Sequence, residues 1–363
     1  MQTSVIIVGQ GLCGTWLSYW LQQAGIPYIV VDEEKENTST RVASGVINPV
    51  TGRRMTRTWL ADTIIPFAVH AYASMHEHIL HELSPAAYQQ EIPLIRRCDI
   101  IDFFSSPDRR IDFEKKATQF AAHLEWPEDE HHFLHHFQYE MGYGIVAPSY
   151  QVDLQQMLEG WRKFLQQKDL LLSEQFDHSA LQLTQQGVQY KDIQASQIVF
   201  ADGVAAAASG YFQLLPFAPN KGEALIVEID GLPASNIYKK GSTITPWKNG
   251  LFWVGSTYEN QYTDILPTAA FRQEKEAWLR SFVKHDFKVI DHLASVRPAT
   301  VERRPFAGWH PLHPQVGILN GTGTKGVTIA PYFGKQLADN IAQQTPMMPE
   351  ADIKRFARVL SRG

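Results

Sequence analysis

The sequence of 363 residues contains only two cysteines, Cys13 and Cys98. Two thiols are too few for a disulfide framework, so they favour a reducing compartment, and we expect a cytoplasmic protein. The chain also lacks any run approaching the ~18 uninterrupted apolar residues of a spanning helix, so we expect no membrane span. The apolar run at 5–8 has no basic region ahead of it, which is typical of a first strand rather than a signal peptide.

Neither sign of charge is in large excess. The sum of 33 Lys and Arg against 38 Asp and Glu gives a net charge of −5 with histidine neutral. This balance argues against broad nucleic-acid binding. A content of 44% hydrophobic and 20% charged residues is typical of a globular protein. The length corresponds to about two domains.

A glycine-rich turn follows the first apolar run. Residues 9–14 have the pattern G-x-G-x-x-G and are followed by a helical pattern at 15–24, an apolar run at 28–31 and an acid, Asp32. This order predicts a β-α-β unit in which glycines let the backbone approach a pyrophosphate and the helix N-terminus faces its charge. The Asp32 carboxylate can accept hydrogen bonds from a ribose. The sequence therefore predicts a dinucleotide site.

A second G-x-G-x-x-G stands at 321–326, between a predicted strand at 316–320 and a helical pattern at 327–343. No second strand and terminal acid complete this unit, so we expect an anion or dipole site that faces the far end of the same cofactor. A third segment, 197–203, is a predicted strand ending in Ala-Asp-Gly, where the backbone can approach a ligand closely.

Together these segments resemble the FAD-dependent D-amino acid oxidase-like superfamily. Its members include glycine oxidase, sarcosine oxidase and the FAD domain of the bifunctional enzyme that modifies the tRNA wobble uridine. The matching segments, which occur in the family's order over most of the chain, are 5–34, 40–49, 150–154, 221–223, 254–259 and 295–305.

The resemblance implies an α/β plus α+β fold. A Rossmann-like FAD-binding domain would carry an inserted substrate domain on an antiparallel sheet. The FAD-binding domain would comprise residues 1–50, 147–215 and 297–363. The substrate domain would comprise 51–146 and 216–296.

The function implied by the resemblance is oxidation of the C–N bond of a small amine or amino acid by hydride transfer to N5 of the flavin. The FAD would be non-covalent, because neither cysteine lies near the segment 321–326. Arg297 matches the family's arginine that holds the substrate carboxylate. Thr243 stands where glycine oxidase-like members carry the tyrosine of a Y-x-x-P strand, and Tyr258 is a nearby candidate to replace it.

The residues expected to bind FAD come from the three glycine-containing segments and from the stretches that match the family. Lys325 among them either adds a positive charge at the flavin or points to solvent. The expected residues are Gly9, Gly11, Leu12, Gly14, Asp32, Glu33, Arg41, Ser44, Gly45, Phe176, Asp202, Gly203, Gly321, Gly323, Thr324, Lys325, Gly326 and Val327.

Histidines crowd the segment 131–136, where a helix would place His131 beside His135 and His132 beside His136. Such pairs can bind a metal, but the segment also fits a polar helix face, and we expect no metal.

Two other functions remain open at this point. One is an FAD-dependent 2-hydroxy-acid dehydrogenase, because an arginine-held carboxylate and hydride removal suit that substrate too. The other is an FAD-containing subunit of an RNA-modifying enzyme. We expect a small carboxylate substrate and no nucleic-acid partner, and leave the oligomeric state open.

Overall fold

A computed structural model describes residues 1–52, 54–85, 88 and 92–362. Its first sheet is built on β1 (Gln2–Val8), which pairs in parallel with β2 (Tyr28–Val31) and β14 (Ile193–Phe200). The parallel order continues with β11 (Leu171–Leu172) beyond β2 and β21 (Val316–Asn320) beyond β14. The strands expected near 5–8, 28–31, 197–200 and 316–320 are thereby confirmed. Both faces of β1 are buried, which explains its continuous apolar run.

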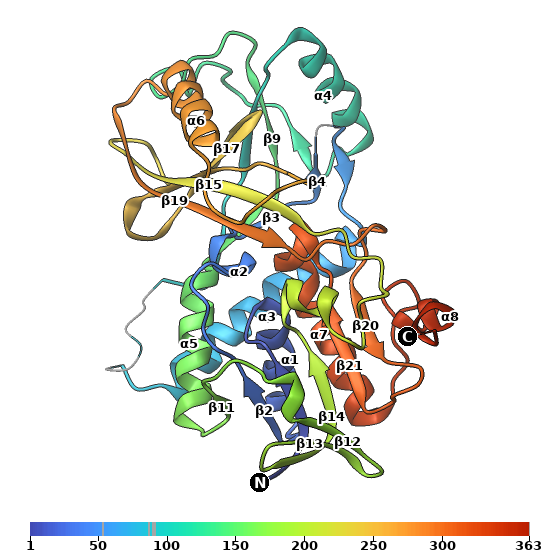
Figure 1. Cartoon of the computed structure of the whole chain (residues 1–363). Helices are drawn as coiled ribbons and strands as arrows, with labels where there is room; N and C mark the ends of the chain where they lie inside the picture. Colours follow the sequence, from blue (N-terminus) through green and yellow to red (C-terminus); the bar gives the residue numbers. More distant parts are fainter. Residues whose placement is uncertain (53, 86–87, 89–91, 363) are drawn as a thin grey trace.

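Four helices cover one face of this sheet: α1 (Leu12–Gln23), α3 (Ala61–Glu82), α5 (Leu154–Gln167) and α7 (Gly326–Gln343) (Figure 1). Their apolar side chains share one core, in which Trp16 is fully buried. The first helix begins at residue 12 rather than 15, because the glycine motif forms its N-cap and first turn. The helix predicted after the second glycine motif is confirmed.

The second sheet has eight strands, and all neighbouring pairs are antiparallel except β16 with β7. Figure 1 shows it in the upper part of the molecule, above the parallel sheet. In order across the sheet the strands are β19 (Phe287–Arg297), β15 (Asn220–Ile229), β18 (Phe252–Gly255), β17 (Ser242–Pro246), β16 (Ile237–Lys240), β7 (Ile100–Phe103), β9 (Tyr143–Val146) and β8 (Leu124–Glu125).

The two faces of the antiparallel sheet have different neighbours. Leu225 and Val254 belong to a core that includes side chains of α6 (Ala269–Phe282). Ala224 and Trp253 point to the opposite face, because side chains alternate along a strand. The indole nitrogen of Trp253 donates to the carbonyl oxygen of Val42, 2.9 Å away, so this second face meets the parallel-sheet part.

The remaining elements are short or lie at the edges. They are α2 (Ser39–Val42), β3 (Val46–Ile47), β4 (Val50–Thr51), β5 (Thr56–Arg57), β6 (Ile95–Arg97), α4 (Pro107–Gln119), β10 (Tyr150–Val152), β12 (Leu181–Thr184), β13 (Gly187–Tyr190), β20 (Phe306–Trp309), α8 (Ala357–Leu360) and five short 3-10 turns. Of the described helices, none has the length and apolar character needed to cross a membrane.

Two expectations for residues 51–146 need correction. Helix α3, assigned from the sequence to the substrate part, packs against α5 and α7 of the parallel-sheet part. Residues 131–136 form successive turns rather than a helix, with Phe133 and Phe137 buried. The segment therefore lacks the continuous helix on which the histidine pairing was based, although Phe133 and Phe137 are joined by one backbone hydrogen bond of 3.0 Å.

Replacing Gly14 with alanine should destabilise the protein by about 2–4 kcal/mol, measured by urea unfolding. An added Cβ would lie 1.8 Å from the carbonyl oxygen of Gly9, so α1 would have to move away from β1. Gly210→Ala is the control, since no described atom beyond its chain neighbours lies within 4 Å of the added carbon. Equal stabilities of the two variants would contradict the close packing.

Candidate active site

A cavity of about 580 Å³ lies where the two sheets meet. The carboxyl ends of β1, β2 and β14 supply one wall, and β15, β18 and β19 supply another. This is the edge at which ligands bind to open parallel sheets. The predicted residues that line it are Gly9, Gly11, Leu12, Asp32, Glu33, Ser44, Phe176, Asp202, Gly203, Arg297, Gly323, Thr324, Gly326 and Val327.

The other predicted residues do not line the cavity. Gly14 allows α1 to contact the backbone of Gly9, and Gly45, with φ of +77°, passes so close to Val152 that a Cβ would lie 2.0 Å from its oxygen. These two glycines allow close packing of backbone segments and do not line the cavity. The other predicted residues outside the lining are Arg41, Thr243, Tyr258, Gly321 and Lys325.

The first glycine turn forms a cradle at the N-terminus of α1. Gly9 has φ of +96°, and a Cβ there would lie 2.8 Å from the oxygen of Ala201 on the adjoining segment. Gly11 caps α1, and the N–H of Leu12 donates to Oγ1 of Thr40 over 3.1 Å. Because Gly9 and Gly11 carry no side chains, the N-terminus of α1 is open to an anionic group.

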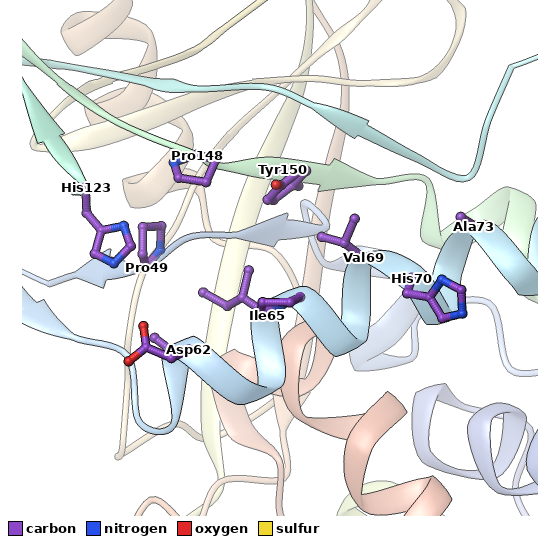
Figure 2. A pocket seen from close by; sticks show the side chains of 11 residues that line it. Pro49, Asp62, Ile65, Val69, His70, Ala73, His123, Pro148 and Tyr150 are labelled. Carbon is purple, nitrogen blue, oxygen red and sulfur yellow. The ribbon is translucent and has the colours of Figure 1, made fainter.

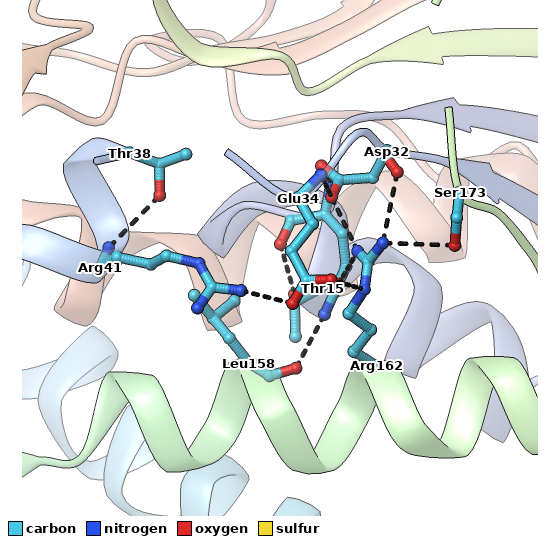
Figure 3. Close-up of polar contacts among 9 residues, drawn as sticks. Thr15, Asp32, Glu34, Thr38, Arg41, Leu158, Arg162 and Ser173 are labelled. Atoms are coloured by element: carbon cyan, nitrogen blue, oxygen red, sulfur yellow. Dashed lines mark hydrogen bonds and ion pairs between the residues drawn. The ribbon is translucent and has the colours of Figure 1, made fainter. Parts of the chain in front are cut away.

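Asp32 is held by groups from three segments (Figure 3). Its Oδ2 accepts from the N–H of Gln10 at 2.8 Å, and its Oδ1 accepts from the N–H of Glu34 at 2.9 Å. Arg162 of α5 also donates to Oδ1, at 2.8 Å, and its Nε lies 2.9 Å from Oε2 of Glu34. Arg162 is only 5% exposed, so this ion pair is shielded from solvent and fixes the Asp32 carboxylate in place.

The sequence alone did not identify Arg162. It lies 130 residues from Asp32 in the chain, within an amphipathic helix where an arginine is ordinary. Arg41, predicted to bind the cofactor, pairs with Oε1 of Glu34 at 3.2 Å (Figure 3). Arg41 and Arg162 thus form ion pairs with the acidic residues Asp32 and Glu34, which follow β2.

Asp202 follows β14 and lines the cavity beside the glycine turn. Asn320 reaches it from the end of β21: its Nδ2 lies 3.5 Å from Oδ1 of Asp202 and donates to the oxygen of Gly203 over 2.9 Å. Burial raises the pKa of the Asp202 carboxyl to about 7. A carboxyl so placed can hold a proton and donate a hydrogen bond near neutral pH.

At the other end of the cavity, Arg297 ends β19. Its Nη1 donates to Oδ1 of Asn220 at 2.8 Å and to the oxygen of Thr257 at 3.2 Å, while Nη2 donates to Oγ of Ser256 at 3.0 Å. Gly222 lies directly against the guanidinium, since a Cβ there would be 2.0 Å from Nη2. All these partners are neutral, and burial lowers the pKa of Arg297. The site therefore presents a positive charge with no carboxylate among these partners.

The two other predicted catalytic residues, Tyr258 and Thr243, differ in their distance from Arg297. Tyr258 is 57% exposed, and its ring centre lies 6.0 Å from the guanidinium carbon of Arg297, at the edge of the site. Thr243 lies within the sheet, where β17 pairs it with Gly255 of β18 and with Lys239 of β16. The structure thus places Tyr258 beside Arg297 and Thr243 farther along the sheet.

A buried carboxylate holds the loop that carries Tyr258. Glu223, which is fully buried, accepts from the N–H and Oγ1 of Thr268 at 2.7 and 2.9 Å and lies 2.9 Å from Nε2 of His292. Lys221 exchanges two backbone hydrogen bonds with Glu259. The loop between β18 and α6 is therefore tied to β15 at both ends.

Lys325 lies between Thr324 and Gly326, which line the cavity, but its side chain turns to the segment after β3. Its Nζ donates to Oδ1 of Asn48 over 2.7 Å. Burial, with a smaller contribution from the charge of Lys239, lowers the pKa of Lys325 to about 7. The side chain therefore does not point to bulk solvent, the second of the two alternatives considered for it.

Both cysteines are buried. Burial raises the pKa of Cys13 to about 12 and that of Cys98 to about 11, so both are neutral thiols at physiological pH. Both are free, and only Cys13 belongs to the lining of the main cavity.

A second cavity of about 500 Å³ lies beside α3 (Figure 2). Pro49, Ile65, Val69 and Tyr150 give it largely apolar walls, and none of the described residues around it is a predicted site residue. Within the described part of the chain there is also no group of three or more His, Cys, Asp or Glu arranged to hold a metal.

Comparison with known proteins identifies similar sequences. A model of the DAO family, described as "FAD dependent oxidoreductase", matches residues 4–340. Glycine oxidase of Bacillus subtilis (strain 168) is 28% identical over 159 residues, which cover 41% of this chain and 42% of that protein. Glycine oxidase of Pseudomonas aeruginosa is 27% identical over 141 residues, 38% of each chain. The chain thus matches about two fifths of the length of these curated relatives.

Solved structures share the fold over nearly the whole chain. Glycine oxidase from Geobacillus kaustophilus has a TM-score of 0.76 at 16% identity, with 98% of both chains covered. Iminodiacetate oxidase from Chelativorans sp. BNC1 has a TM-score of 0.74 at 19% identity, covering 97% of this chain and 98% of that one. L-proline dehydrogenase from P. horikoshii has a TM-score of 0.76 at 14% identity, covering 98% of both.

Asp202→Asn should stabilise the FAD-free protein by about 1–3 kcal/mol at pH 8 and leave its stability unchanged at pH 4. The raised pKa means that folded Asp202 keeps a proton that the unfolded chain loses between about pH 4 and 7. Stability therefore falls as pH rises through that window, and asparagine cannot ionise. Urea unfolding at both pH values measures the difference, with exposed Asp192→Asn as the control. An equal shift at both pH values would argue against a buried acid.

Proposed function

Because the chain belongs to the DAO family of FAD dependent oxidoreductases, we propose that it oxidises the C–N bond of a small amine or amino acid bearing a carboxylate. The observation that carries this proposal is Arg297. Its guanidinium lines the same cavity as the glycine turn and contacts neutral oxygens of Asn220, Ser256 and Thr257. A bidentate carboxylate is the anion that best fits such a fork.

In this proposal the parallel-sheet part is a Rossmann-like FAD-binding domain, and the antiparallel sheet carries the substrate domain inserted into it. The proposed FAD-binding domain is made of residues 1–50, 147–215 and 297–363, to which we add α3 on the basis of its packing. The rest of 51–146, with 216–296, forms the substrate domain.

The residues of the cavity fit FAD at both ends. The turn at Gly9 and Gly11 leads into the N-terminus of α1, where a pyrophosphate can bind, and a Cβ at Gly9 would lie 2.8 Å from the oxygen of Ala201, so only glycine allows this backbone path. Asp32, fixed by Arg162, offers oxygens to the ribose. At the opposite end, backbone N–H groups near Gly323 and Gly326 begin α7 and can stabilise negative charge on the flavin.

When bound, FAD supplies the two-electron acceptor for the hydride that leaves the carbon next to nitrogen. The side chains orient the substrate: Arg297 fixes the carboxylate, and Tyr258 beside it covers the outer edge of the site. Thr243 is too short to act as the family's tyrosine would and lies outside the lining of the main cavity, so we assign it no part in the reaction. Named relatives that act on amines, glycine oxidase, iminodiacetate oxidase and L-proline dehydrogenase, support this substrate class over 2-hydroxy acids.

The two free, buried thiols are also in keeping with a reducing compartment, and the cytoplasm is our proposed location.

Anaerobic addition of amino acids should bleach the visible flavin absorbance of the purified protein, and 2-hydroxy acids should not.

Arg297→Met should weaken substrate binding about 10- to 100-fold, because a charge-assisted bidentate contact is lost. The dissociation constant comes from the dependence of the bleaching rate on substrate concentration, and exposed Arg358→Met is the control. Reduction by hydroxy acids alone, or unchanged binding in Arg297→Met, would refute the proposal.

Acid precipitation should release all of the FAD into the supernatant. The thiol of Cys13 is buried and neutral and that of Cys98 packs in a different cluster, so neither provides a thiolate for attachment. Flavin fluorescence of pellet and supernatant measures the distribution, and Cys13→Ser should retain FAD before precipitation. Flavin left in the pellet of the unmodified protein, and lost in one cysteine variant, would show a covalent bond.

A further inference from the structure

The side chain of Arg297 reaches across a neighbouring strand to its hydrogen-bond partners. Arg297 ends β19, and β15 lies between β19 and β18 in the sheet. Gly222 of β15 lies against the guanidinium, where a Cβ would be 2.0 Å from Nη2. The missing side chain at Gly222 lets the arginine pass over β15 to Ser256 and Thr257, which directly follow β18.

Asn220 holds the guanidinium from β15. It is paired with Arg297 across the two strands, so both side chains lie on the same face of the sheet. Its Oδ1 accepts from Nη1 at 2.8 Å. Asn220 is fully buried, and within the part of the chain that the structure describes its Nδ2 has no hydrogen-bond partner. One half of the amide therefore binds the arginine, and the other half is unpaired in the interior.

These contacts leave one edge of the guanidinium unused. Nη1 carries two N–H groups and makes two hydrogen bonds, to Asn220 and to the oxygen of Thr257. Nη2 donates once, to Oγ of Ser256. Among the described residues, none accepts from Nε or from the second N–H of Nη2. Since Nε and Nη2 form a fork that fits both oxygens of a carboxylate, and Arg297 lines the main cavity, this edge can bind a substrate.

The positive charge of Arg297 is also left unpaired. Its acceptors are an amide, a hydroxyl and a backbone carbonyl, and in the described ranges of the chain no carboxylate oxygen lies within 4 Å of its nitrogens. Charged side chains that are largely buried are normally paired. An aspartate at position 220 would have nearly the shape of Asn220, would supply that pair and would leave no N–H unpaired. The asparagine is therefore the less stabilising choice in the protein without substrate.

We propose that Asn220 is a positioning residue that makes the site selective for a carboxylate over an uncharged group of the same shape. Its oxygen orients the guanidinium so that the edge formed by Nε and Nη2 is left for the substrate. Its neutrality leaves the charge of Arg297 available to the substrate. This inference rests on the proposed function, in which Arg297 binds the substrate carboxylate, and identifies the residue that sets the strength of that contact.

The first test compares the binding of propionate and propionamide, which have nearly the same shape and differ by one charge. Neither has an amine to be oxidised, so each can be titrated against the flavin absorbance of the FAD-loaded protein. Asn220→Asp should lower the preference for propionate about 10- to 100-fold, because an internal ion pair replaces the charge-assisted contact with the ligand. Asn220→Ala removes the acceptor but adds no charge, and should lower the preference only about 3- to 10-fold.

The order of the two variants decides between charge and shape. If hydrogen bonding to Arg297 were the whole role of Asn220, aspartate would replace it better than alanine. An unchanged preference in Asn220→Asp, or a smaller preference in Asn220→Ala than in Asn220→Asp, would therefore overturn the proposal.

Thermal unfolding of the FAD-loaded protein excludes damage to the fold. Asn220→Asp should raise the unfolding midpoint by about 1–4 °C, because an ion pair replaces an unpaired buried amide. A midpoint below that of the unmodified protein would contradict the assignment. Asn249→Asp is the matched control, since Asn249 is exposed and lies before β18, at the end of that strand opposite to Ser256. It should change neither the midpoint nor the preference for propionate.

The same titrations separate this proposal from the proposed function. If no amine reduces the flavin, but the preference for propionate falls in the predicted order, the role of Asn220 stands and the proposed reaction falls. If amines reduce the flavin, but Asn220→Asp still prefers propionate as strongly as the unmodified protein does, the proposed reaction stands and the role of Asn220 falls.

Discussion

The architecture depends on the contact between α1 and β1 at backbone distance. Gly14 rests on the carbonyl of Gly9, where even a methyl group would lie 1.8 Å from the oxygen. The same helix presses Trp16 against Gly334 of α7, where a Cβ would lie 3.0 Å from the tryptophan side chain. Because α7 begins at the second glycine motif, this tight packing sets the positions of both glycine-rich turns. The two ends of the cavity are therefore held by contacts that only small residues permit.

The two ends differ in how charge is satisfied. At the β2 end, Asp32 is held by Arg162 and backbone N–H groups, so a ligand there meets a fixed acceptor. At the opposite end, Arg297 and Lys325 contact neutral oxygens of Asn220 and Asn48. Neutral acceptors orient a cation without cancelling its charge. The carboxylate at the first end is thus ion-paired within the protein, whereas Arg297 at the second has no carboxylate among its hydrogen-bond partners named above.

Much of this could be predicted from the sequence, because short patterns encode it. The strands beside the glycine turns and the helix at 326–343 follow from runs of apolar residues bounded by glycine. The role of Arg162 could not be predicted, since its ion pair joins residues 130 positions apart and nothing local marks it.

The sheet order has a consequence for the synthesis of the chain. Strand β21 pairs with β14 but is separated from β1 by most of the sequence, and the second glycine turn follows it. At ~5–20 residues per second, that turn emerges roughly 15 to 60 s after the first one. During this interval the N-terminal unit exposes apolar surfaces that α7 and β21 later cover. The cavity therefore lacks the wall that contains the second glycine turn until nearly the whole chain has been synthesised.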